Sequence, residues 1–216
     1  MRRYLPILLL IALVVGCNRE GFDLEQSTLI PIVVATHTPK GDSLLGEGVA
    51  LALLGSSFDK TKEYQFSLSS PSETYVWERM VAPFSSNDLL YVGSNDLLLP
   101  PDETLEGGLW QVELFLPDGR QRSQEIEFTP SRATLDEALF KVSLLPPLEW
   151  EASDKGWHID PYEGEWFYTL YGPTPAKSFR GEVVVDAKTK GETAAIVALH
   201  YDEGSHLFYV VRTLFD

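Results

Sequence analysis

The sequence has one cysteine, Cys17, and only two methionines in 216 residues. A single cysteine cannot form an intramolecular disulfide, so a packed core must hold the fold together. The apolar run at residues 5–16 is shorter than the roughly 20 residues that a membrane-spanning helix needs. The motifs G-x-S-x-G, H-E-x-x-H and the P-loop are absent. These motifs are the main sequence signals of several enzyme classes.

Basic residues are scarce as well. The chain has 17 Lys+Arg against 32 Asp+Glu, a net charge of −15. Such a surface repels phosphate backbones, which argues against nucleic-acid binding. It also disfavours peripheral docking on anionic lipid.

The N-terminus has the features of an export signal. Arg2 and Arg3 precede the apolar run 5–16, which ends at Cys17. A positive start followed by a short apolar stretch is typical of a signal peptide. The sequence VVGC at 14–17 resembles the lipobox of bacterial lipoproteins, in which a small residue precedes the cysteine.

This resemblance implies cleavage between Gly16 and Cys17, with a diacylglyceryl group on the Cys17 thiol and an acylated amine. Two or three acyl chains anchor a protein firmly. Removal of residues 1–16 leaves 15 basic against 32 acidic residues, a net charge of −17. Asn18 stands where some lipoproteins carry the aspartate that retains them at the inner membrane, so the resemblance favours the outer membrane, on its periplasmic or surface face. The alternative is an ordinary signal peptide with a coincidental cysteine.

The remaining chain predicts a mainly β protein. After the signal peptide 1–16 we expect a polar tether at 17–27, a β-sandwich domain at 28–130, a helical connector at 131–147 and a smaller β-rich domain at 148–216. Evenly spaced short strands favour a sandwich for the first β segment. The patterns do not decide whether the two β segments are separate domains.

A predicted hairpin supports the sandwich. Asp118-Gly119 is a turn signal between two alternating runs. The apolar residues that share one face of these runs are Trp110, Val112, Leu114, Leu116, Ile126 and Phe128. A Gly-aromatic strand leading to an Asp-Gly turn resembles the last two strands of an immunoglobulin-like or fibronectin-type-III-like domain, which implies a sandwich for 28–130.

The connector is the clearest helix signal. Thr134 and Glu137 form a capping box, and Leu135, Ala138, Leu139 and Val142 would line one face. Beyond it, the last run of the chain is strongly apolar, so we expect the C-terminus to be built into a sheet.

An aromatic cluster at 150–171 is the main candidate binding site. Within it, Trp157, Tyr162 and Trp166 could stack on sugar rings while nearby carboxylates accept hydroxyl hydrogen bonds. The alternative is that these large side chains build a core without disulfides.

Metal and catalytic sites have weaker signals. His200 and His206 flank a turn with Asp202 and Glu203, a partial zinc ligand set. His158 with Asp160 forms two-thirds of a catalytic triad, and Glu163 with Glu165 is a carboxylate pair. None is a complete site, so we expect no metal and no cofactor.

These patterns predict a non-enzymatic envelope lipoprotein. It would act as a binding, adhesion or envelope-assembly module, held at the membrane by its N-terminal lipid and meeting a protein or glycan partner. The alternative is a carbohydrate-binding lipoprotein that uses the 150–171 aromatics, and a hydrolase comes third.

Overall fold

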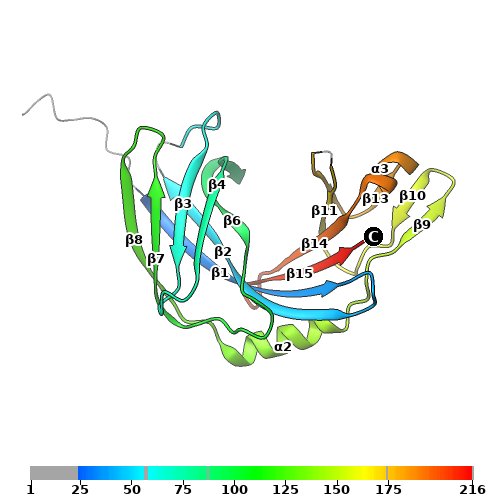
Figure 1. Cartoon of the computed structure of the whole chain (residues 1–216), viewed down its shortest axis with the longest axis horizontal. Coiled ribbons are helices and arrows are strands. Elements are labelled where there is room, and N and C mark those ends of the chain that lie inside the picture. Colours follow the sequence, from blue (N-terminus) through cyan, green and yellow to red (C-terminus); the bar gives the residue numbers. More distant parts are fainter. Residues whose placement is uncertain (1–23, 56–57, 87, 174, 216) are drawn as a thin grey trace, which may run out of the picture.

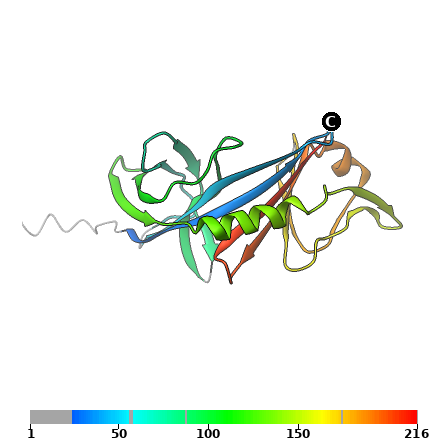
Figure 2. The ribbon, with the colours of Figure 1, turned by 90° about the horizontal axis from the view of Figure 1, so that it is seen from below.

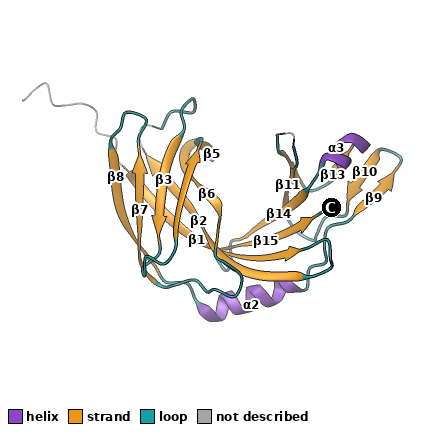
Figure 3. Ribbon diagram, viewed as in Figure 1, coloured by secondary structure: helices purple, strands orange, loops and turns teal. Residues whose placement is uncertain are grey.

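The computed structural model describes residues 24–55, 58–86, 88–173 and 175–215. The predicted signal peptide and the lipidation site at Cys17 lie outside these residues. Within them the chain forms fifteen strands in three sheets and two helices (Figure 3). The predicted mainly β fold class is therefore confirmed.

The first half of the chain is a sandwich of two four-stranded layers. One layer has the order β1-β2-β6-β5 and the other β4-β3-β7-β8. The strands of the first layer are β1 (Leu24–His37), β2 (Ser43–Gly55), β5 (Phe84–Ser86) and β6 (Leu89–Leu98). Those of the second are β3 (Tyr64–Ser69), β4 (Val76–Val81), β7 (Gly108–Phe115) and β8 (Gln121–Phe128). This is the ABED and C′CFG strand order of immunoglobulin-like sandwiches.

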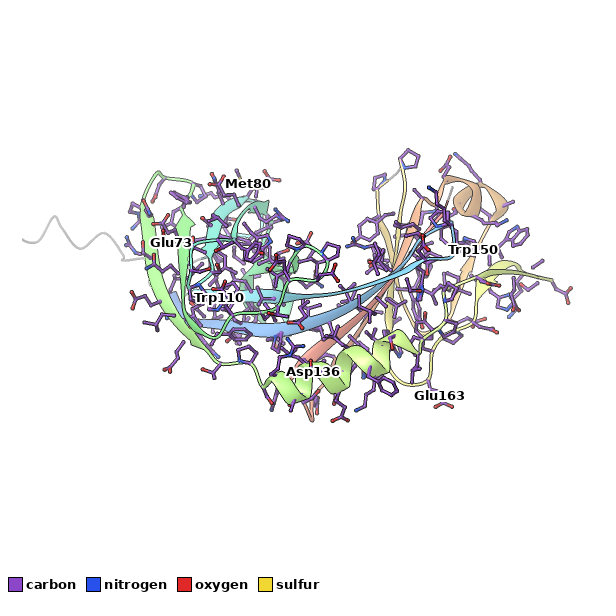
Figure 4. All side chains as sticks on the ribbon, turned by 60° about the horizontal axis from the view of Figure 1, so that its bottom comes forward. Glu73, Met80, Trp110, Asp136, Trp150 and Glu163 are labelled. Carbon is purple, nitrogen blue, oxygen red and sulfur yellow. The ribbon has the colours of Figure 1, made fainter. Side chains whose placement is uncertain are left out.

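The alternation predicted for β7 and β8 places their apolar side chains in the sandwich core. Trp110, Val112 and Leu114 are fully buried, and Trp110 lies among the side chains between the layers (Figure 4). The hairpin turns at Gly119, whose φ of +85° suits a glycine. Strand β1 begins at Leu24, so residues 24–27, predicted as the end of the tether, belong to the sheet.

The second half of the chain adds strands to the same large sheet. Its elements are α2 (Arg132–Ser143), β9 (Trp150–Ser153), β10 (Gly156–Ile159), β11 (Phe167–Tyr171), β12 (Lys177–Arg180), β13 (Val183–Val185), α3 (Ala187–Glu192), β14 (Ala195–Asp202) and β15 (Leu207–Leu214). Strand β15 runs parallel to β1, which extends the sheet in the order β12-β11-β14-β15-β1. The C-terminal run is thus inside the sheet, as predicted. The short strands β13, β10 and β9 form the third sheet.

Helix α2 lies across the sheet beneath β1, β2 and β15 (Figure 2). Its buried residues are Leu135, Ala138 and Val142. The predicted cap at Thr134 is wrong. The helix begins at Arg132, and the hydroxyl of Ser131 accepts the Thr134 N–H at 3.4 Å, because Ser131 stands three residues earlier and suits the N-cap equally well.

A buried carboxylate joins α2 to the sheet. Glu47 on β2 is 2 % exposed, and its Oε1 lies 2.5 Å from the Arg132 guanidinium. Its other oxygen accepts the Leu105 N–H at 2.8 Å. Arg132 also pairs with Asp136 at 2.7 Å. Glu47 therefore ties together β2, the start of α2 and the loop before β7.

The large sheet curls strongly. The sandwich rises on one side of β1, β2 and β15, and β11 with β12 rises on the other (Figure 1). Helix α2 covers the convex face. No helix among the described residues is long and apolar enough to span a bilayer.

Candidate functional site: an apolar trough

The concave face of the large sheet carries an apolar surface of its own. Strand residues alternate between the two faces, so one set packs under the sheet and the other lines its concave side. The concave set, which we call the trough, consists of Ile30, Ile32, Val34, Ala50, Leu98, Val197, Leu199, Phe208 and Val210. It is separate from the main core, which fills the sandwich and the space beneath α2. The sheet is therefore apolar on both faces.

Small residues on β2 lower the floor of the trough. Gly46 pairs with Val34 and Ala50 pairs with Ile30 across the β1–β2 ladder. Gly48 lies between them, where a Cβ atom would meet the Leu97 carbonyl oxygen at 2.6 Å. A side chain at position 48 would thus push β2 and β6 apart. The absence of a side chain at Gly48 therefore lets β6 approach β2 closely.

Two hollows lie in the trough and both touch Asn95. The first has about 410 Å³ and is lined by Phe84, Tyr91 and Phe208 among others. The second has about 350 Å³ and is lined by Phe167, Tyr171, Val197, Val210 and Arg212 among others. Both volumes fall in the range of small-molecule sites, roughly 300–1,000 Å³.

Exposed aromatic side chains form the rims. Phe84, Phe167 and Tyr171 are 45 %, 47 % and 48 % exposed. Phe84 stacks on Tyr91 with ring centroids 5.6 Å apart. Exposed apolar side chains gathered around a hollow are typical of an interaction site.

One positive charge stands in the second hollow. Arg212 on β15 lies between Thr36 of β1 and Val197 of β14 in the ladder. Among the described residues no carboxylate oxygen lies within 4.0 Å of its guanidinium. Asp96, which lines the same hollow, is held by Arg79 at 3.7 Å and by the Ser94 hydroxyl. The hollow thus holds a guanidinium without an ion-pair partner within 4.0 Å among the described residues, and a carboxylate that already has partners.

Two of the aromatics proposed for glycan stacking pack into the protein. Trp166 is 5 % exposed and stacks on His200 with centroids 5.2 Å apart. Tyr162 contacts Trp166 edge-on at 5.0 Å, and its hydroxyl donates to the Pro146 carbonyl oxygen at 2.5 Å. Burial raises the pKa of Tyr162 well above its ordinary value. Trp166 is therefore buried, whereas Tyr162 is half-buried and lines a hollow of about 410 Å³ with Glu151 and Asp160.

Trp157 lies apart from them on β10. The Lys190 ammonium of α3 sits 3.7 Å from its ring centroid and covers one face. By contrast, Phe167 and Tyr171, which belong to the same aromatic stretch, face the trough. The period of two in β11 separates them from the buried Tyr168.

The structure does bring His158 and Asp160 together, and it adds Glu151. The His158 Nε2 atom lies 3.5 Å from both carboxylates. The donor atoms of all three residues lie within 4.8 Å of one another, so they could hold a metal ion. Side-chain contacts without a metal ion account for the same geometry. Glu151 has no local sequence signal, because it meets His158 across the β9–β10 ladder.

The other predicted polar groups make separate contacts. The His200 Nδ1 atom lies 2.7 Å from the Glu165 carbonyl oxygen, and the His206 Nδ1 atom lies 3.1 Å from the Tyr201 hydroxyl. The Glu165 carboxylate pairs with Arg180 at 2.9 Å. The two histidines therefore do not share a ligand site, and Glu163 is exposed in its loop (Figure 4).

Sequence reasoning missed the trough as a site. Its residues come from β1, β2, β6, β14 and β15 and form no local motif. The chain matches no protein-family model, and no curated protein matches it.

Proposed function

We propose that this protein is a lipid-anchored lipoprotein of the bacterial cell envelope that acts as a non-enzymatic binding module, and that the trough is its binding surface. The observation that carries the proposal is the pair of apolar hollows on the concave face, with the exposed Phe84, Phe167 and Tyr171 on their rims. The VVGC motif at 14–17 supports the anchor. Asn18 supports an outer-membrane location.

The trough suits an apolar partner on energetic grounds. Its rim residues are about half exposed and its floor is hydrophobic. Covering such surface stabilises a complex by roughly 25 cal/mol per Å² of apolar area, before the costs of association. The curled sheet holds the floor in place, so little ordering is needed on binding.

The proposed anchor would keep the trough near the membrane. The first described strand begins at Leu24, seven residues after Cys17. At no more than about 3.6 Å per residue, seven residues span at most about 25 Å. An apolar ligand that leaves the bilayer would therefore meet this surface within a short distance.

A filling substitution tests the binding surface. Ala52 lines the first hollow, whereas Ala152 is exposed on β9 and lines none of the hollows described above. We expect the full-length chain in neutral lipid nanodiscs to be labelled on trough peptides by an uncharged alkyl diazirine. Ala52→Trp should lower that labelling severalfold, and the matched Ala152→Trp variant should not. Equal labelling of all three proteins would contradict the proposal.

A second test addresses the anchor. Cys17→Ala should release the chain from its lipid attachment, which fractionation of cell membranes and mass spectrometry of the N-terminal peptide will show. An unmodified Cys17 in the wild-type chain would overturn the lipoprotein assignment and leave the trough untouched.

A further inference from the structure

We propose that the trough binds a single-chain amphiphile with a carboxylate head, of the long-chain fatty acid type, whose head group is held by Arg212. This inference rests on the proposed function of the trough as a binding surface. It adds the chemical class of the occupant and the direction in which it lies.

The head group follows from the charges in the second hollow. Arg212 has no carboxylate partner among the described residues, and a guanidinium binds a carboxylate through two parallel hydrogen bonds. Asp96 is already engaged by Arg79 and Ser94. A monoanion neutralises the single free guanidinium. A phosphate monoester, with about −1.5 to −2 charges, would leave excess negative charge beside Asp96. The phosphodiester of a diacyl phospholipid is also a monoanion and differs in having two tails.

The tail follows from the length of the trough. From Arg212 to Phe208 along β15 is four residues, roughly 13 Å, and from β15 across β1 and β2 to β6 is three strand spacings, roughly 14 Å. The diagonal from Arg212 to Leu98, the β6 residue in the ladder row of Phe208, is therefore about 19 Å, and the Phe84–Tyr91 pair lies further along the sheet. A zigzag chain with carbon–carbon bonds of about 1.5 Å advances about 1.25 Å per carbon, so about 15 carbons fill this length.

The two hollows of about 410 Å³ and 350 Å³ adjoin, because Asn95 lines both. A single tail that starts at Arg212 would fill the second hollow and point toward the first. Phe167 and Tyr171, which line the second hollow, would contact it.

Photocrosslinking of the full-length chain in neutral phosphatidylcholine nanodiscs tests this assignment. The probes are a 16-carbon fatty acid with a diazirine near its tail, the matching alcohol and a diacyl phospholipid with the same diazirine. The variants are Arg212→Met and, as a matched control, Arg120→Met. Arg120 lies in the β7–β8 turn, where it pairs with Asp118.

We expect the acid to label peptides of β6. Labelling should fall at least tenfold in Arg212→Met, because a charge-assisted hydrogen bond is removed, and should be unchanged in Arg120→Met. Excess unlabelled palmitate should block labelling by the acid probe. Equal labelling by acid and alcohol, unaffected by Arg212→Met, would overturn the inference and leave the apolar binding surface standing. Preferential labelling by the diacyl probe would overturn the single-chain assignment. If no probe labels the trough, the proposed function falls as well.

Discussion

The ion pair between Glu47 and Arg132 gives a sharp prediction, because its two partners differ in burial. The side chain of Glu47 is 3 % exposed and that of Arg132 is 43 % exposed. Removing either partner breaks the same 2.5 Å contact. The costs should nevertheless be unequal, since only one change leaves a charge stranded in the interior.

Arg132→Met leaves the Glu47 carboxylate buried, with the Leu105 N–H as its described hydrogen-bond donor. Removing one member of a buried pair costs about 3–5 kcal/mol, and we expect about 3 kcal/mol here. Glu47→Gln keeps an oxygen for the Leu105 N–H, and Arg132 can turn to Asp136 and water. That variant loses only the charge-assisted part of its bonds, about 1 kcal/mol.

Equilibrium urea unfolding followed by tryptophan fluorescence measures both losses. The double variant should cost about 2 kcal/mol less than the sum of the single ones, because it contains no stranded charge. Arg120→Met, which breaks an exposed pair with Asp118, serves as the control and should leave the midpoint unchanged. The reasoning is refuted if Arg132→Met costs no more than Glu47→Gln.

Two further predictions concern the sheet. Burial lowers the pKa of His37, so the folded state favours the neutral ring, and the free energy of unfolding should fall as the pH drops below about 6.5. His37→Gln should flatten that decline between pH 7 and pH 5, as urea midpoints would show; an unchanged slope would contradict it. Gly48→Ala should cost about 2 kcal/mol because its Cβ would meet backbone at 2.6 Å. At the control position Gly191 a Cβ atom would meet no atom within 4 Å, so Gly191→Ala should leave the stability unchanged. Equal melting temperatures of the two variants would refute this prediction.

The sequence alone determined the features that depend on local pattern. The period of two in 110–116 predicted which side chains fill the sandwich, and Asp118-Gly119 predicted the hairpin turn. The apolar residues spaced three or four positions apart in 135–142 predicted the buried face of α2. These signals are reliable because neighbouring residues set the direction of each side chain. The cap was misplaced because two hydroxyl residues stand three positions apart and each suits the N-cap.

Only the tertiary structure decided what joins the two halves and which apolar face stays open. The parallel pairing of β1 with β15 connects residues about 175 positions apart in sequence, and no local pattern specifies such a partner. The ion pair of Glu47 with Arg132 depends on the same long-range packing. Strands β1 and β15 are apolar on both faces, so their sequences do not say which face α2 covers. The trough exists because α2 packs on one face of the curled sheet and the hollows open on the other, a consequence of packing that periodicity cannot express.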